Sequence, residues 1–233
     1  MRFLPYRYAF LTRDEVLAVR LYSGPAYQPI NRFLRAVANV TDEHRLALAQ
    51  STQVTFTATV RLLTDAIRKL AAVATPEEQA QELWRGVRGE LPSTFWLRDK
   101  QGMICAVDMA FMSTSRNRET PIRYMEHGTP NVLWHLQPQL ETDSAFHHGA
   151  HIKLLSQFAG EDEVLYPPCT MLLLAERAAA ASDEQHSPAD RMRNAVEKVS
   201  PRFEARLERS RFQDSQTEDG KRYTSISVLP HFL

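Results

Sequence analysis

The chain is poor in glycine and in cysteine. Only 8 of its 233 residues are glycine, and neither GxGxxG nor GxxxxGK[ST] occurs, which excludes the two common glycine-rich phosphate-binding loops. Cys105 and Cys169 are its two cysteines, too few for a disulfide framework or a cysteine-based zinc site. We expect both thiols to be packed side chains. Any nucleotide site in this protein therefore requires another architecture.

An excess of one charge and a long apolar run are also missing. The 28 basic and 28 acidic residues cancel, so the net positive field that attracts nucleic acid is absent, and we expect no nucleic-acid partner. No window reaches the length of a membrane span, and the start MRFLPYRYAFLTRDE lacks the apolar run of a secretory signal. We expect a soluble protein, and the sequence leaves open whether it is cytoplasmic, secreted or injected.

Helical periodicity dominates residues 1–82. Thr12 followed three places later by Glu15 matches a capping box ahead of an apolar stripe. A second helix is predicted over 30–37, and a third from Phe56, where apolar residues recur at spacings of 4, 3, 4 and 3. The segment TPEE (75–78) has the cap, proline and glutamate that begin another helix.

Strand patterns dominate after residue 82. Short apolar or alternating runs at 103–112, 131–136, 151–155 and 169–175 are separated by turn-forming residues, and the end of the chain returns to alternation. Residues 176–221 are instead rich in charge and helix formers. We predict one α+β domain over 1–233, in which a helical lobe (1–82) packs on a mostly antiparallel β core (83–175 and 222–233) carrying a helical insertion (176–221).

Three segments of the β half carry candidate chemistry. Arg85 precedes Gly86, the hydroxyl cluster 113–115 ends an apolar strand, and the triplet EDE spans 161–163. In an extended segment Glu161 and Glu163 share one face, with the middle residue solvated. Their proximity predicts that one of the two carboxyls has a raised pKa. Taken singly, each segment also fits a surface ion pair, a strand-end hydroxyl cluster or a solvated turn.

Taken in order, these segments resemble those of the arginine-specific mono-ADP-ribosyltransferases, the group of cholera-toxin-like and ecto-ADP-ribosyltransferases. LWRGVRGELP (83–92) resembles the arginine segment of that family, AFMSTSRN (110–117) its serine segment, and HIKLLSQFAGEDEVLYPP (151–168) its glutamate segment. Residues 11–35 are similar to its first helices and 223–232 to its closing strand. The resemblance implies an ADP-ribosyltransferase fold with a two-sheet β core.

The resemblance also implies a reaction and its residues. ADP-ribose would pass from NAD to an arginine of a protein acceptor, with release of nicotinamide and no metal. Glu163 would stabilise the cationic ribose, held by Ser113, and Glu161 would orient the acceptor and take its proton. Arg85 would bind the diphosphate, and Gly86 the carboxamide of nicotinamide.

The loops around these segments complete the implied site. Ser115 would share the wall formed by Ser113, and Asn117 and Arg118 would contact the cofactor, although arginines here also fit an ordinary charged surface. Gln157 and Phe158 precede the glutamates, where the family meets its protein target. The enzyme's own arginines are further possible acceptors.

Other interpretations remain open at this point. An NAD glycohydrolase would use water in place of the guanidinium, and an inactive relative would bind NAD or protein without turnover. The presence of Glu161 and of all three key segments favours transfer. The segment HHGAH (147–151) lacks an evident fourth ligand, so we expect no metal. We expect Trp84, Trp96 and Trp134 to belong to the core. The target, the oligomeric state and the choice between NAD and NADP are not determined.

Overall fold

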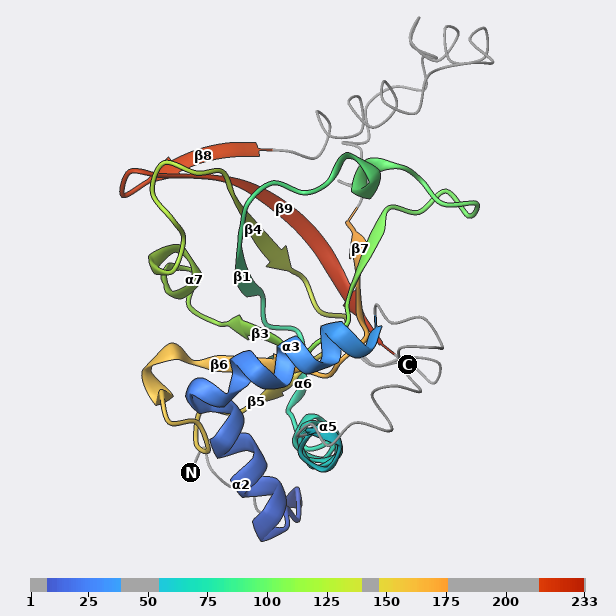
Figure 1. Cartoon of the computed structure of the whole chain (residues 1–233), viewed down its shortest axis with the longest axis vertical. Coiled ribbons are helices and arrows are strands. Elements are labelled where there is room, and N and C mark those ends of the chain that lie inside the picture. The colour runs from blue at the N-terminus through green and yellow to red at the C-terminus, as the bar shows by residue number, and fades with distance from the viewer. Residues whose placement is uncertain (1–7, 39–54, 140–146, 176–213, 233) are drawn as a thin grey trace, which may run out of the picture.

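The computed structural model describes residues 8–38, 55–139, 147–175 and 214–232, and Figure 1 shows their arrangement. Most of the helices lie on one side of a long, curved sheet, and the short helix α7 (Glu119–Arg123) lies apart from them, beside another part of the sheet. The helices are α2 (Arg13–Leu21), α3 (Tyr27–Ala38), α5 (Thr57–Ala71), α6 (Pro76–Gln79) and α7 (Glu119–Arg123). Single turns occur at η1 (Tyr22–Ala26), η2 (Ser93–Trp96) and η3 (Ala159–Glu161).

The helices begin where the sequence supplies caps. The Thr12 hydroxyl accepts from the backbone N–H of Glu15 at 3.2 Å, and the Glu15 carboxylate accepts from the backbone N–H of Thr12 at 2.7 Å. Thr75 and Glu78 form the same reciprocal pair before α6. Both predicted capping boxes are therefore confirmed. Each of them satisfies backbone N–H donors that the first helical turn leaves unpaired.

Within the described residues, nine strands form one hydrogen-bonded sheet in the order β2-β7-β9-β4-β1-β3-β6-β5, with β8 beside β9. All neighbours are antiparallel except β4 and β9, which are parallel. The strands are β1 (Leu83–Arg88), β2 (Cys105–Asp108), β3 (Met112–Ser115), β4 (Asn131–Leu136), β5 (Ala150–His151), β6 (Glu163–Tyr166), β7 (Thr170–Leu174), β8 (Asp214–Glu218) and β9 (Lys221–His231). The predicted α+β class and mostly antiparallel core are confirmed.

The pairing between neighbouring strands is shortest between β1 and β3. These strands share a single residue pair, Trp84 with Ser115, whereas β1 and β4 pair along their full lengths. The described strands therefore fall into two groups within one sheet, and the two separate sheets that the resemblance implied are not found among them. One core packs α2 and α5 against the β3-β6-β5 group and includes Val19, Leu63 and Leu165. A second core lies on the larger group, around residues such as Trp134 and Val228.

Several predicted boundaries are wrong, each for a local reason. The run 103–112 is not one strand, because the side chain of Asp108 accepts from the backbone N–H of Ala110 at 3.1 Å and turns the chain. The serine cluster consequently forms the last three residues of a separate strand, β3, and does not follow a strand over 103–112. Only the start of 151–155 pairs in β5, because the backbone N–H of Leu155 turns back to the carbonyl of Ile152.

The end of the predicted insertion is also misplaced. Residues 214–218 form β8, joined to β9 by Asp219 and Gly220, whose φ angles are 49° and 70°. An Asp-Gly pair with both φ angles positive is the preferred two-residue hairpin turn. This signal was present in the sequence and we overlooked it. The remainder of the insertion, 176–213, lies outside the described residues.

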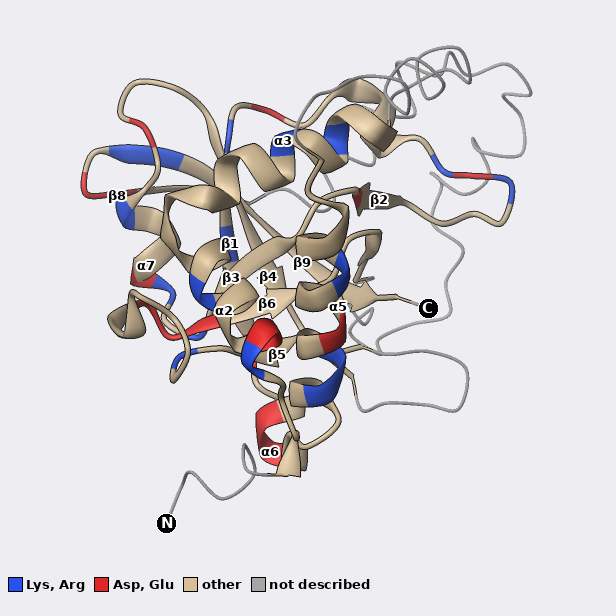
Figure 2. Ribbon diagram, turned by 60° about the horizontal axis from the view of Figure 1, so that its bottom comes forward, with Lys and Arg blue, Asp and Glu red and all other residues tan. Residues whose placement is uncertain are grey.

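The described surface carries both charges. Figure 2 shows basic and acidic residues interspersed over the helices and loops. None of the described helices is both long and apolar enough to cross a membrane. The prediction that both thiols are packed is wrong for Cys169, which is exposed, while Cys105 is half-buried.

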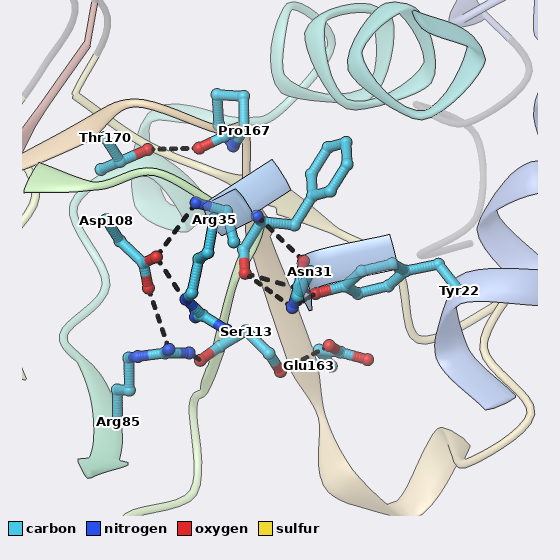
Figure 3. A network of polar contacts seen from close by, with 11 residues as sticks. Tyr22, Asn31, Arg35, Arg85, Asp108, Ser113, Glu163, Pro167 and Thr170 are labelled. Atoms are coloured by element: carbon cyan, nitrogen blue, oxygen red, sulfur yellow. Dashed lines mark hydrogen bonds and ion pairs between the residues drawn. The ribbon is translucent and has the colours of Figure 1, made fainter. Parts of the chain in front are cut away.

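A buried amide joins α3 to the chain that enters β3. The Asn31 side chain accepts from the backbone N–H of Phe111 at 3.2 Å, and donates to the Phe111 carbonyl at 3.3 Å and to the Tyr22 hydroxyl at 3.0 Å (Figure 3). The Tyr22 and Phe111 rings meet edge to face at 5.3 Å. Asn31 thereby satisfies the backbone N–H of Phe111, which the core would otherwise leave unpaired, and shares the Phe111 carbonyl with the Tyr22 hydroxyl, which donates to it at 3.3 Å.

Replacing Asn31 should therefore destabilise the fold. We expect Asn31→Ala to lower the free energy of unfolding by about 2 kcal/mol, because it leaves the buried backbone N–H of Phe111 without an acceptor. Urea denaturation followed by circular dichroism measures this change. Gln28→Ala, an exposed change on the same helix, should cost less than about 0.5 kcal/mol. Equal stability of the two variants would contradict the anchoring role of Asn31.

Candidate active site

A cavity of about 890 Å³ lies between η1 and α3 on one side and β1, β3, α7 and the segment 158–163 on the other. It falls in the size range of small-molecule and cofactor sites. Seven of the predicted residues contribute to its lining, namely Arg85, Gly86, Ser113, Ser115, Phe158, Glu161 and Glu163. The three segments singled out in the sequence therefore meet at one place.

Glu163 lies at the inner end of this cavity. It is the first residue of β6 and only 7% exposed, and the Ser113 hydroxyl donates to its Oε1 at 2.5 Å (Figure 3). Burial raises the pKa of Glu163 to about 7, and the Glu161 carboxylate adds to the rise, while the Ser113 hydroxyl and the Arg85 guanidinium oppose it. The predicted raised pKa is found, but burial and not carboxylate repulsion is its larger cause.

Glu161 lies near the mouth of the cavity. The hydroxyl of Tyr124, an exposed residue just after α7, donates to its Oε1 at 2.5 Å. This bond to Glu161 is also the main reason why the pKa of Tyr124 is raised, so the phenol is held in its protonated form. Tyr124 was missed in the sequence, where no pattern connects it to a glutamate 37 positions away.

The two glutamates reach one cavity by a turn and not by strand alternation. Asp162 between them adopts the left-handed conformation, with φ 51° and ψ 50°, which aspartate tolerates better than most residues. Its carboxylate lies 2.8 Å from His151 Nε2 and 3.1 Å from Lys153 Nζ. The predictions that the segment is extended and that Asp162 is solvated are therefore wrong.

Arg85 connects the serine segment to a second acidic residue. Its side chain projects from the middle of β1 and donates to the Ser113 carbonyl at 2.8 Å and to Asp108 at 3.0 Å. The adjacent Gly86 allows α7 to approach, since a Cβ atom there would lie 3.0 Å from the Pro121 carbonyl oxygen. Asp108 received no role from the sequence, because a single aspartate at the end of a strand carries no motif.

Ser115 supports the glutamate loop. Its hydroxyl donates to the Glu161 carbonyl at 2.7 Å and accepts from the backbone N–H of Asn117 at 3.0 Å. Although it lines the cavity, both of these bonds are to backbone groups. Ser115 is thus placed to hold the chain that carries Glu161.

Three predicted residues are not brought to the cavity lining. Asn117 caps the turn into α7 by accepting from the backbone N–H of Glu119. Arg118 turns toward the β8–β9 hairpin, where it bonds Glu218 at 2.9 Å and the Tyr223 hydroxyl. Gln157 donates to the Arg20 carbonyl at 2.7 Å. Their side chains are engaged in structural contacts.

The tryptophans are only partly as predicted. Trp96 and Trp134 belong to the core, and that prediction is confirmed. The prediction holds only in part for Trp84, which is half-buried and packs against a small core cluster that includes Leu133, but also lines the cavity. Its ring stacks on His135 with centroids 5.5 Å apart. Trp84 thus contributes from β1 both to the core and to the cavity lining.

The histidines of HHGAH have separate surroundings. His147 lies beside His231, with 3.1 Å between Nδ1 atoms, and His148 contacts the Ala71 carbonyl at 3.1 Å. His151 faces Asp162 instead. Among the described residues, no group of three or more metal-ligating side chains is positioned to hold an ion.

Comparisons with known proteins identify the family and the fold. The model of the NAD:arginine ADP-ribosyltransferase family matches residues 5–185. In fold, the chain is similar to the ADP-ribosyltransferase toxin Vis from Vibrio splendidus in complex with M6 inhibitor, with 20% identity, TM-score 0.55, and coverage of 96% of this chain and 76% of that one. It is also similar to HopU1 of Pseudomonas syringae pv. Tomato DC3000, with 18% identity, TM-score 0.53, and coverage of 97% and 80%.

A search of curated proteins found no match. At these identities the solved structures show the fold alone, whereas the family model covers most of the chain. The expected resemblance is confirmed by both findings. Members of this family use NAD as co-substrate. The protein belongs to the NAD:arginine ADP-ribosyltransferase family.

Proposed function

We propose that this protein transfers ADP-ribose from NAD to the guanidinium of an arginine in a protein acceptor and releases nicotinamide. One observation supports this proposal most directly. Glu163 and Glu161 line the same cavity, and each is held by its own hydroxyl, Ser113 for the inner carboxyl and Tyr124 for the outer one. Two separately positioned carboxyl groups can serve two reaction partners.

Glu163 suits the ribose half of the reaction. When the C1′–N bond breaks, both bonding electrons go to the pyridinium, so nicotinamide leaves neutral and needs no acid. The sugar becomes oxocarbenium-like, as in glycoside hydrolysis. An ionised Glu163 stabilises this cation, and its burial makes the interaction stronger than in water. Ser113 fixes the carboxylate so that little reorganisation is required.

Glu161 suits the acceptor half. A guanidinium nitrogen forms the new bond to C1′ and loses a proton, which Glu161 receives. The exposed rings of Tyr27, Tyr124 and Phe158 line the same cavity, and aromatic faces favour a planar cation. Vis has been solved in complex with agmatine, a guanidinium compound of the class that we propose as acceptor.

Substitution of the glutamates should separate the two halves. Glu163→Gln should lower both nicotinamide release and labelling of agmatine by about a hundredfold or more, because it removes the charge that faces the ribose cation. Glu161→Gln should lower labelling by about a hundredfold and leave nicotinamide release by hydrolysis. Radiolabelled NAD and chromatography measure both products.

Glu77→Gln provides the matched control, since Glu77 is exposed on α6. It should leave both products unchanged. Nicotinamide release by the wild type without labelling of agmatine or of an arginine-rich protein would instead identify an NAD glycohydrolase. NAD binding without either product would identify an inactive binding module.

Loss of the tyrosine hydroxyl should affect the acceptor alone. Tyr124→Phe keeps the ring and removes the bond to Glu161, so the carboxylate becomes less well oriented. We expect the KM for agmatine to rise about tenfold, because the free energy of a hydrogen bond to a charged group is large enough to change binding by about that factor. The KM for NAD should stay constant in initial-rate measurements. An equal rise in both KM values would contradict a role confined to the acceptor.

The pH dependence should reveal the ionisation of Glu163. Since its pKa is raised to about 7, the reactive carboxylate is lost as the pH falls through that value, and kcat/KM for NAD should fall with it. Ser113→Ala removes a bond that favours the carboxylate, so this acidic limb should move to higher pH. A limb in the ordinary glutamate range would contradict the assignment.

The raised pKa also predicts a pH-dependent stability. The fold binds the Glu163 proton more tightly than the unfolded chain does, so this stabilisation is complete below the ordinary glutamate pKa and is lost as the pH rises through about 7. Glu163→Gln removes the ionisable group. The difference in stability between Glu163→Gln and the wild type should therefore be more favourable to the variant at about pH 8 than at about pH 4. Thermal denaturation at both pH values measures the difference.

A further inference from the structure

Asp108 binds two arginines of the cavity wall. It is the last residue of β2, and its side chain is 16% exposed. Its Oδ2 lies 3.0 Å from Arg85 Nη2 and its Oδ1 lies 3.3 Å from Arg35 Nη2, as Figure 3 shows. Since Oδ1 also accepts from the backbone N–H of Ala110 at 3.1 Å, the carboxylate is fixed by the main chain.

The two arginines come from different parts of the fold. Arg85 projects from β1 and Arg35 from the last turn of α3, and both line the cavity. Asp108 does not contribute to that lining, so its carboxylate lies behind the guanidinium groups and not in front of them. Two guanidinium groups and one carboxylate leave a net charge of about +1 facing the cavity.

Arg35 depends on this contact more than Arg85 does. Arg85 is 19% exposed and also donates to the Ser113 carbonyl, whereas Arg35 is 49% exposed. Like charges repel, and a half-exposed arginine regains side-chain freedom when it turns to solvent. Without Asp108, Arg35 would therefore move away from Arg85 and from the cavity.

We propose that Asp108 is a positioning residue, which holds Arg35 and Arg85 together as a paired binding site for the diphosphate of NAD. Each guanidinium carries five N–H donors in a planar fork, so donors remain beyond those bonded to Asp108 and match phosphate oxygens. The inference rests on the proposed use of NAD, but not on the identity of the acceptor.

Calorimetric binding of NAD to purified full-length variants tests this role. Asp108→Asn and Arg35→Ala should each weaken NAD binding by about tenfold. The double variant should weaken NAD binding by much less than the roughly hundredfold expected for independent effects, because both substitutions break the same contact between Asp108 and Arg35. ADP-ribose, which carries the diphosphate, should lose affinity in parallel. Inhibition by nicotinamide, which lacks the diphosphate, should be unchanged.

Two controls separate positioning from damage to the fold. Asp65→Asn changes a half-exposed aspartate on α5 that also pairs with an arginine, Arg61, at 3.8 Å, and should leave NAD binding unchanged. At saturating NAD, kcat of Asp108→Asn should stay within about threefold of the wild type, since a residue used only in binding NAD changes KM and not kcat.

Each other outcome has a distinct meaning. Unchanged or tighter NAD binding by Asp108→Asn would overturn the proposal, as would multiplicative losses in the double variant or a parallel loss of nicotinamide inhibition. If wild-type protein binds NAD but does not label agmatine, the proposed transfer fails and the role of Asp108 is still decided by the binding data.

Discussion

The antiparallel register of β3 against β6 is the constraint on which the site depends. It sets Ser115 opposite Glu163 and Ser113 opposite Leu165, so that the serine segment lies along the glutamate segment. From that alignment the Ser113 hydroxyl reaches the Glu163 carboxyl, and the Ser115 hydroxyl reaches the backbone of Glu161. A shift of one residue would turn all of these side chains to the opposite face of the strands.

The position of β1 completes this arrangement. It touches β3 at one residue pair only, yet Arg85 donates to the Ser113 carbonyl. The narrow junction leaves space between the two groups of strands, and the cavity lies there, covered by α3. Asn31 ties α3 to Phe111 on the chain entering β3. Elements far apart in sequence thus meet through polar contacts that leave the wall of the cavity well defined.

A buried carboxyl is costly, and its surroundings explain its use. Removing Glu163 from water favours the neutral form, and only the Ser113 hydroxyl and the Arg85 guanidinium act against that tendency. In the proposed reaction a ribose cation would become a further partner and would favour the ionised form. The same burial that disfavours the empty carboxylate therefore strengthens its interaction with a developing positive charge.

The sequence by itself determined much of the local structure and the identity of the chemical groups. Capping boxes, helical periods and most strands follow from interactions within a few residues, and the order of the arginine, serine and glutamate segments indicated the family. The Asp-Gly hairpin at 219–220 was also encoded locally, although we overlooked it. The class of fold and the segments that form the site were therefore accessible from the chain.

Only the tertiary structure decided how these groups meet. Asp108 reaches Arg85 and Arg35, and Tyr124 reaches Glu161, because separate elements pack together. The same packing turned Arg118 toward β8 and brought Trp84 to the cavity wall. Such contacts depend on the distances between side chains of different elements and on the directions in which these side chains point. The residue type at a given position in the sequence gives no information on either.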